Sequence, residues 1–302
     1  MRYYVGIDGG GTKTLFKCAD EKLNEIKTLS FPSCHVLQVE QNQAIEILKN
    51  GISQIFDGLP DNDIEICICA GLAGYGNDQS IRKRIVMIAS EAFQGKPFIL
   101  YNDAQIALAG ALNNEDGILV IAGTGSIALS KYQGQIYRSG GWGYMLGDEG
   151  SAYWIAKQLL EEYTMQCDGR SPKTQVVKAL KQYCNLKDDY DIISYISNIL
   201  GNERDKIASL AKIAFELAEN KDPASLRIYD QAGYHIASLI NALATNVDQV
   251  YKASYIGGVF NAGNIILDPI QNNLKKNIEL CKPYNDPAYG AILLAKEMFD
   301  HK

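Results

Sequence analysis

Two stretches of this chain share one pattern: an apolar segment enters a turn rich in glycine and threonine and leaves it in another strand-like segment. The first reads GIDGGGTKT (residues 6–14) and the second LVIAGTGSI (residues 119–127). Glycine lets the backbone approach a ligand closely, and such a turn can direct several N–H groups at a phosphate. Two equivalent turns, one opening each half of the chain, predict two hairpins that together clamp a polyphosphate.

The order of the expected strands and helices, read from the spacing of apolar residues, extends this repetition. Each half predicts three strands followed by alternating helices and strands. The expected strands are 3–8, 14–19, 25–31, 64–72 and 98–101, then 117–122, 126–131, 135–138, 254–257 and 278–281. The expected helices are 40–56, 80–92, 104–111, 264–276 and 287–299, with a helical insertion over 157–244. The polar break at Asn113–Asp116 predicts two lobes, 1–114 and 115–302.

The first turn is a near miss to a Walker A loop, because Thr12 stands where the lysine is required and a strand pattern, not a helix, follows. A plain glycine-rich hairpin turn is the alternative. The candidate phosphate-binding residues of the two turns are Gly10, Gly11, Thr12, Lys13, Thr124 and Gly125.

Asp103 follows a short predicted strand and directly precedes a predicted helix. One interpretation is a helix N-cap, a position that favours Asp. The other is a general base, since a carboxylate at the carboxyl end of a strand faces the crevice where α/β folds bind ligands. Kinases need a carboxylate to orient the attacking hydroxyl and accept its proton.

The most distinctive stretch is GGWGYMLGDEGSAYW (residues 140–154). Its five glycines exclude a regular element, and they surround Trp142 and the adjacent carboxylates Asp148 and Glu149. Such a loop could lay backbone and a carboxylate against the hydroxyls of a sugar. In the alternative interpretation, Trp142 anchors the core and Asp148 caps the next helix.

Several function classes are excluded by composition. The net charge is −6, and the sequence shows no basic patch of the kind that binds nucleic acid. The N-terminus does not resemble a signal peptide, and no apolar run is long enough for a membrane span. Seven unevenly spaced cysteines predict a reduced, cytoplasmic protein, and Cys67 and Cys69 are expected in the core.

Together these motifs resemble the N-acetylglucosamine kinase branch of the BadF/BadG/BcrA/BcrD-type ATPase family, in the superfamily of actin, hexokinase and the heat-shock ATPases. The resemblance covers almost the whole chain, and residues 140–154 are its most specific part. It implies an α/β fold of two RNase H-like lobes with a central cleft, ATP and Mg²⁺ as cofactors, and a homodimer.

The resemblance also implies roles for individual residues. Asp8 would hold hydrated Mg²⁺, Asp103 would be the base, and the two turns would contact the phosphates. The sugar would be held by Ser126, Gly141, Trp142, Gly143, Asp148 and Asp103, and the adenosine by Gly258, Val259 and Gly263. Cys34 occupies the position of a sugar-binding Asn in the family, which changes the hydrogen bonding there. In the insertion only Ser209 is a candidate.

The expected activity is ATP-dependent phosphorylation of an N-acetylated amino sugar. Two alternatives stay open at this point. One is an ATPase activator of a 2-hydroxyacyl-CoA dehydratase, which needs cysteines for an iron–sulfur cluster. The other is a sugar sensor without turnover, against which the retention of Asp8, Asp103 and both turns argues.

Overall fold

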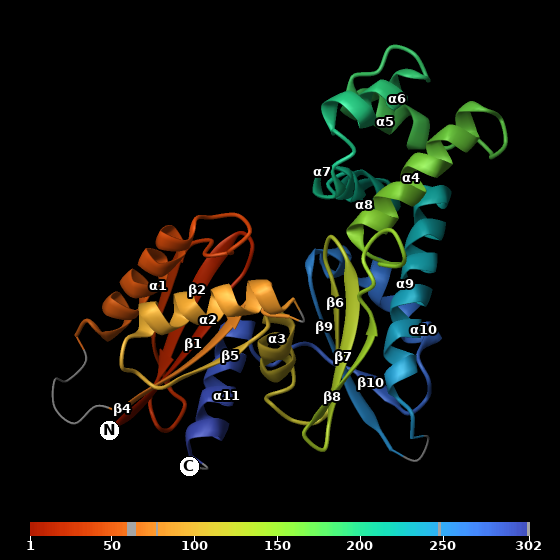
Figure 1. The fold of residues 1–302 in the computed structure, drawn as a ribbon. Helices are drawn as coiled ribbons and strands as arrows, with labels where there is room; N and C mark the ends of the chain where they lie inside the picture. The colour runs from red at the N-terminus through yellow and green to blue at the C-terminus, as the bar shows by residue number, and fades with distance from the viewer. Residues whose placement is uncertain (59–64, 77, 247–248, 301–302) are drawn as a thin grey trace. The chain divides into compact units, whose positions relative to one another are not determined.

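The computed structural model describes residues 1–58, 65–76, 78–246 and 249–300 (Figure 1). The chain folds into two compact units, Met1–Asp116 with Lys282–Lys302, and Gly117–Cys281. The expected boundary after residue 114 lies close to this division. The expected extent of the second lobe differs, because residues 282–302 pack with the first unit.

Each unit contains one five-stranded mixed sheet, and the two sheets have the same topology. The strand orders are β3-β2-β1-β4-β5 and β8-β7-β6-β9-β10. In both, the first three strands in sequence pair antiparallel and the last two add in parallel. The strands of the first sheet are β1 (Arg2–Gly9), β2 (Lys13–Ala19), β3 (Glu25–Pro32), β4 (Glu65–Leu72) and β5 (Phe98–Tyr101). Those of the second are β6 (Gly117–Ala122), β7 (Ser126–Tyr132), β8 (Gln135–Gly140), β9 (Tyr251–Ile256) and β10 (Ile278–Leu280). The predicted α/β class and internal repeat are confirmed.

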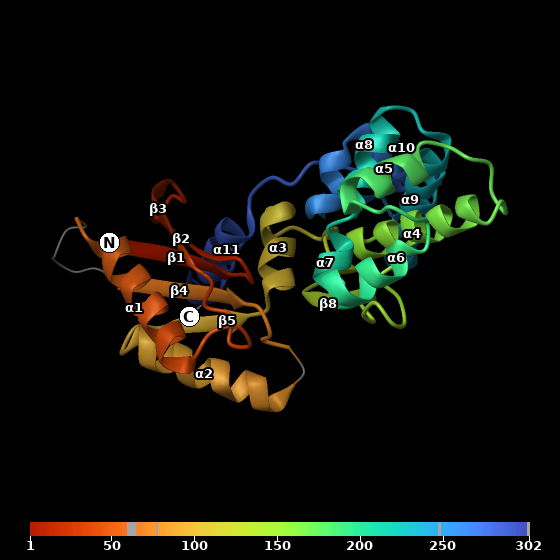
Figure 2. The ribbon, with the colours of Figure 1, turned by 90° about the horizontal axis from the view of Figure 1, so that it is seen from above.

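Helices cover both faces of the first sheet (Figures 1 and 2). They are α1 (Gln41–Phe56), α2 (Gln79–Phe93), α3 (Asp103–Ala111) and α11 (Pro287–Asp300). Because side chains alternate along a strand, Val5 and Ile7 of β1 pack with α1 and α2, whereas Tyr4 packs with α3 and α11. Cys67 and Cys69 share that second face and are fully buried, as expected.

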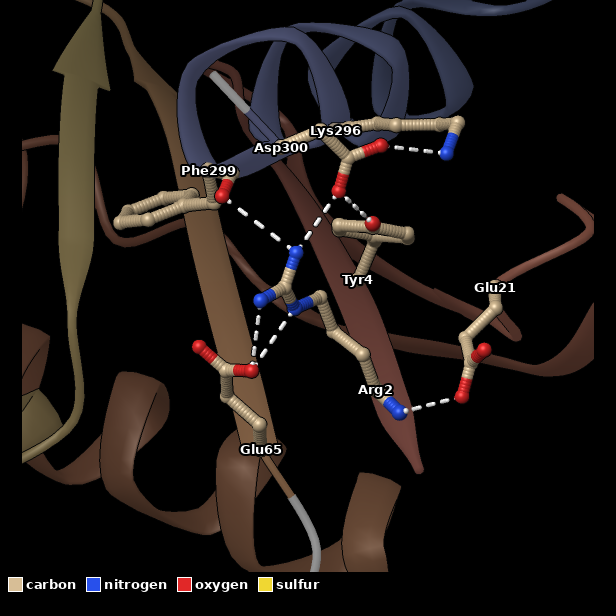
Figure 3. Close-up of polar contacts among 7 residues, drawn as sticks. All are labelled: Arg2, Tyr4, Glu21, Glu65, Lys296, Phe299 and Asp300. Atoms are coloured by element: carbon tan, nitrogen blue, oxygen red, sulfur yellow. Dashed lines mark hydrogen bonds and ion pairs between the residues drawn. The ribbon is translucent and has the colours of Figure 1, made fainter. Parts of the chain in front are cut away.

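The C-terminal helix α11 lies against β1 and α3 (Figure 2). The contact is so close that a Cβ on Gly6 would lie 1.9 Å from the carbonyl oxygen of Ala288. The far end of α11 is joined to β1 by polar contacts (Figure 3). Arg2 bonds Glu65 and Asp300, and Asp300 also accepts a hydrogen bond from the Tyr4 hydroxyl. These contacts integrate the end of the chain into the first unit.

The second unit carries the helical insertion between β8 and β9. Its helices are α4 (Ala152–Cys167), α5 (Val176–Cys184), α6 (Asp191–Ser194), α7 (Arg204–Ala208), α8 (Ala211–Glu219) and α9 (Pro223–Leu243), with a π-helix at Tyr195–Ile199. The 3-10 helix η2 (Gly258–Ala262) and α10 (Asn264–Asn273) follow β9. Helix α9 packs on β6, β7 and β8, and α10 packs on α9. The core of this unit joins the sheet to the insertion.

Element boundaries depart from expectation mainly around β9. The expected strand over 254–257 begins earlier, at Tyr251, because Tyr251 and Lys252 pair with β10. The helix expected to reach residue 276 ends at Asn273. Ile64, the first residue of one expected strand, lies outside the described residues. Among the described helices, each is too short or too polar to cross a bilayer.

Candidate active site

The first turn connects β1 to β2. Gly9 pairs with Thr14, and the N–H of Gly10 donates to the carbonyl of Lys13 over 3.1 Å. Gly11, Thr12 and Lys13 are exposed at its tip, where a ligand could reach their N–H groups. The turn therefore has the hairpin geometry predicted from the sequence.

The loop after β3 supports this turn, and sequence reasoning missed that support. The hydroxyl of Ser33 donates to the carbonyl oxygen of Gly10 over 2.9 Å. A Cβ on Gly11 would lie 3.3 Å from the amide nitrogen of Gln38. No local pattern marks Ser33 or Gln38, since their contacts lie more than 20 residues away in sequence.

The second turn connects β6 to β7 in the same topological position. Ala122 pairs with Ser126, and the N–H of Gly123 donates to the carbonyl of Gly125 over 2.9 Å. The N–H of Ala152 donates to the carbonyl of Gly123 over 2.8 Å, which joins the turn to the start of α4. The equivalence of the two turns is thus a property of the fold, and their phosphate binding stays a prediction.

Asp103 is not the N-cap of α3. That position belongs to Asn102, whose side chain accepts a hydrogen bond from the backbone N–H of Gln105. Asp103 is the first residue of the helix, and its side chain is exposed. Within the described residues, its carboxylate accepts one hydrogen bond, from the N–H of the adjacent Ala104 over 3.0 Å. The capping interpretation of Asp103 is therefore wrong, and its carboxylate remains open to a ligand.

The carboxylate of Asp8, near the end of β1, lies in an acidic environment. The pKa of Asp8 is raised to about 6, first by burial and then by the charges of Asp103 and Asp286, against the opposing effect of Lys13. The structure thus brings together Asp8, Lys13 and Asp103 within the first unit. Among the described residues, no three His, Cys, Asp or Glu side chains form a cluster that could enclose a metal ion.

Asp286 was missed by sequence reasoning. It precedes α11, accepts a hydrogen bond from the N–H of Tyr289, and forms an ion pair with Lys17 at 2.9 Å. The order Asp286-Pro287 is a typical helix-start signal, so the cap could have been recognised. Its electrostatic effect on Asp8 could not, because α11 reaches β1 only through the tertiary fold.

Cys34 lies beneath the first turn and is only 4% exposed. A Cβ on Gly9 would lie 3.0 Å from its Sγ, and burial raises the pKa of the Cys34 thiol. Its N–H donates to the hydroxyl of Thr14 over 3.1 Å. This placement favours packing over the sugar contact that the resemblance implies, and that contact stays a prediction.

Residues 141–151 form an irregular loop, as their glycine content predicts. The N–H of Gly141 donates to the carbonyl of Ser126, and the Ser126 hydroxyl donates to the carbonyl of Glu149 over 2.8 Å. The loop is therefore joined to the second turn at both ends. Trp142 is 66% exposed, with the Arg138 guanidinium 5.0 Å from its ring centre, so the core-anchor interpretation is wrong. Gly143 belongs to the same exposed segment.

Asp148 is buried at the base of this loop, with a left-handed backbone at φ 63°. It does not cap α4, since the Ser151 side chain accepts the N–H of Trp154 there. Its Oδ2 instead lies 2.6 Å from Nη2 of Arg204, at the start of α7. Sequence reasoning missed Arg204, because 56 residues separate the pair.

A cavity of about 340 Å³ lies beside η2 in the second unit. Its lining includes the expected Gly258 and Val259, together with Ser209 and Lys212 of the insertion and Asn261. This volume lies in the range of small-molecule sites. The third expected residue, Gly263, lies between η2 and α10.

Residues 5–295 match the BadF/BadG/BcrA/BcrD ATPase family. The chain is 32% identical to an N-acetylmuramic acid/N-acetylglucosamine kinase of Clostridium acetobutylicum, over 99% of this chain and 100% of that protein. It is 28% identical to an N-acetyl-D-glucosamine kinase of Dictyostelium discoideum, over 97% of both. A crystal structure from Chromobacterium violaceum, provisionally assigned as an N-acetylglucosamine kinase, matches with a TM-score of 0.73 and 25% identity over 98% of this chain and 99% of that one.

Proposed function

Because this chain belongs to the BadF/BadG/BcrA/BcrD ATPase family, we propose that it transfers a phosphoryl group from ATP to a hydroxyl of an N-acetylated amino sugar. N-acetylglucosamine, giving N-acetylglucosamine 6-phosphate, is the first choice of substrate and product. Two full-length relatives are named as kinases of this sugar, and one of them also as a kinase of N-acetylmuramic acid.

The observation that carries the mechanism is the free carboxylate of Asp103. Since Asn102 caps α3, Asp103 is available to accept the proton of the attacking hydroxyl. A sugar hydroxyl is far too weak an acid to ionise at neutral pH, so a base within about 2.6–3.2 Å is needed as the phosphoryl group transfers.

The phosphates would be bound by the N–H groups and side chains of the two turns, with Gly10, Gly11, Thr12 and Lys13 in one and Thr124 and Gly125 in the other. Mg²⁺ fits at Asp8, because two neighbouring carboxylate charges already raise the pKa of Asp8 and favour a cation there. Mg²⁺ takes one or two carboxylates and keeps several waters, so Asp8 suffices to hold the hydrated ion. When bound, the ion would offset the charge of the phosphates.

The sugar and the nucleoside would occupy different parts of the second unit. The loop from Gly141 to Asp148 would offer backbone groups to the sugar, with Ser126 beneath it, and the buried Asp148 would offer the carboxylate oxygen that Arg204 does not use. The cavity at Gly258 and Val259 would take the adenosine.

A coupled assay of ADP release tests this function. We would supply ATP, Mg²⁺ and one sugar at a time from N-acetylglucosamine, N-acetylmannosamine, N-acetylmuramic acid and glucosamine. Sugar-dependent ADP release, lowered by roughly 10²–10⁴-fold in Asp103→Asn, is the expected result. Binding of sugar with no ADP release above background would indicate a sensor.

The activator of a 2-hydroxyacyl-CoA dehydratase is the rival enzyme within the same family. It requires cysteines that can bind a cluster, whereas five of the seven are buried and Cys167 and Cys281 are partly exposed. Purified protein with the brown colour of an iron–sulfur cluster would favour the activator. The homodimer and the cytoplasmic location stay predictions from the sequence.

A further inference from the structure

Arg204 lies directly against the second turn. A Cβ on Gly125 would be 2.3 Å from Nη2 of Arg204 and 2.7 Å from Oδ2 of Asp148. Any residue larger than glycine would therefore displace one of these two charged groups. Helix α7 of the insertion thus places a guanidinium against the backbone of the second turn. Both partners of this contact belong to the second unit.

The guanidinium has hydrogen-bonding capacity that the protein does not use. Arginine carries five N–H donors in a fork that matches phosphate oxygens. In Arg204, Nη2 donates to Asp148, whereas Nε is buried and finds no acceptor among the described residues. The side chain is 34% exposed, and its Cζ lies 5.6 Å from the centre of the Tyr144 ring. Because Nε itself is enclosed, an anion at the turn would be bound by the terminal nitrogens of the guanidinium.

Asp148 explains how this cation is held. It is 4% exposed, and a buried carboxylate without a partner would be strongly unfavourable. The carboxylate therefore keeps the guanidinium at Gly125 when no ligand is present. The same insertion lines the cavity beside η2 through Ser209 and Lys212.

We propose that Arg204 binds the phosphate chain of the nucleotide at the second turn, with Asp148 holding its guanidinium in place. This inference rests on the proposed function, because it takes a nucleotide as the ligand of the turn and the cavity. It gives the helical insertion a direct part in nucleotide binding.

The test compares Asp148→Asn with the double variant Asp148→Asn/Arg204→Gln, so that neither protein leaves a buried carboxylate without its cation. The amide oxygen in Asp148→Asn can still accept the hydrogen bond from Nη2, so Arg204 stays at the turn in that variant. Titration calorimetry without sugar would measure the affinities for the ATP analogue AMP-PNP and for adenosine. We expect the double variant to bind AMP-PNP about tenfold or more weakly than Asp148→Asn does, as for loss of a charged hydrogen bond. The affinity for adenosine should be the same in both.

A matched control is Asp168→Asn/Arg170→Gln, which removes an exposed ion pair from the same unit. This pair should leave both affinities unchanged. Thermal unfolding confirms that each variant is folded. If the double variant does not fold, Arg204→Lys, which keeps the charge without the fork, is compared with the unaltered protein instead. Equal AMP-PNP binding by the two Asp148 variants, or equal weakening of AMP-PNP and adenosine, overturns the role of Arg204. Failure of the unaltered protein to bind either ligand instead overturns the proposed function.

Discussion

Asn102 and Gln105 cap each other at the start of α3. The side-chain oxygen of Asn102 accepts the backbone N–H of Gln105 over 2.8 Å, and the Gln105 side chain accepts the N–H of Asn102 over 3.3 Å. This reciprocal capping box satisfies the helix end without Asp103. The cap of α3 therefore does not use the Asp103 carboxylate, as the proposed role of Asp103 requires.

Replacing Asp103 by Asn should lower kcat by roughly 10²–10⁴-fold, since that is the usual contribution of a general base. The affinity for the sugar should change less, because Asn keeps the size of the side chain. Steady-state kinetics with N-acetylglucosamine would measure both. A kcat close to that of the unaltered enzyme would remove Asp103 from the mechanism.

The neighbouring substitution Asn102→Ala is the matched control for stability. It should lower the free energy of unfolding by about 1 kcal/mol, because it removes the cap of α3. Asp103→Asn should change this free energy much less. Urea unfolding of both variants checks this difference, and a larger loss of stability in Asp103→Asn would return Asp103 to a structural role.

Replacing Asp8 by Asn should stabilise the protein above pH 6 in the absence of Mg²⁺. The pKa of Asp8 is raised to about 6, so the folded state binds its proton more tightly than the unfolded state does. Ionisation of Asp8 therefore costs stability as the pH rises from about 4 to 6, by up to roughly 3 kcal/mol. In urea unfolding, the free energy of unfolding of Asp8→Asn should exceed that of the unaltered protein at pH 7.5 and equal it at pH 4.

Mg²⁺ should reverse this advantage. The unaltered protein should gain stability from the ion because the ion neutralises the carboxylate, and Asp8→Asn should gain little. Binding of Mg²⁺ to the unaltered protein should also weaken as the pH drops below about 6, where the metal-free Asp8 becomes protonated. Equal stabilisation of both proteins by Mg²⁺ would show that Asp8 does not hold the ion.

Replacing Cys34 by Ala should lower the free energy of unfolding by about 1 kcal/mol, because a buried group under the first turn is lost. The order of preference among amino sugars should stay the same, since the thiol packs against Gly9. A panel of sugars assayed with Cys34→Ala measures this order. A changed order would place the thiol in contact with the sugar.

Replacing Asp300 by Asn should weaken the attachment of α11 shown in Figure 3. Hydrogen bonds from Lys296, Tyr4 and Arg2 lower the pKa of Asp300 to about 2, so the carboxylate stabilises the fold above about pH 4 and loses this effect as the pH falls to 2. The side chain is 31% exposed, so the loss at pH 7 should stay within about 1 kcal/mol. Unfolding at pH 7 and pH 2 should show a difference only at pH 7.

The local elements could be predicted from the sequence because their signals are local. Continuous apolar runs mark β1 and β6, and each glycine-rich turn that follows joins two antiparallel neighbours. The same three-strand start in both halves was therefore visible before any tertiary contact was known. The candidate residues of the turns and of the loop at 140–154 followed from this pattern.

Packing decided what local patterns could not. The sequence alone assigned residues 282–302 to the second lobe, because they follow its last strand. In the structure, α11 packs against β1, where only glycine at position 6 leaves room for its backbone. Such a contact joins the two ends of the chain, and the spacing of apolar residues at either end does not reveal it.

The sequence by itself determined the two hairpins and the repeat, and it supplied the candidate site residues. Only the tertiary structure decided their partners: it brought Asp286 within electrostatic reach of Asp8 and placed Arg204 on Asp148. A turn is specified by the conformational preferences of adjacent residues. The pKa of a side chain and the hydrogen bonds that it leaves unmade depend on the charges and the burial that distant residues supply. Those surroundings exist only once the chain has packed.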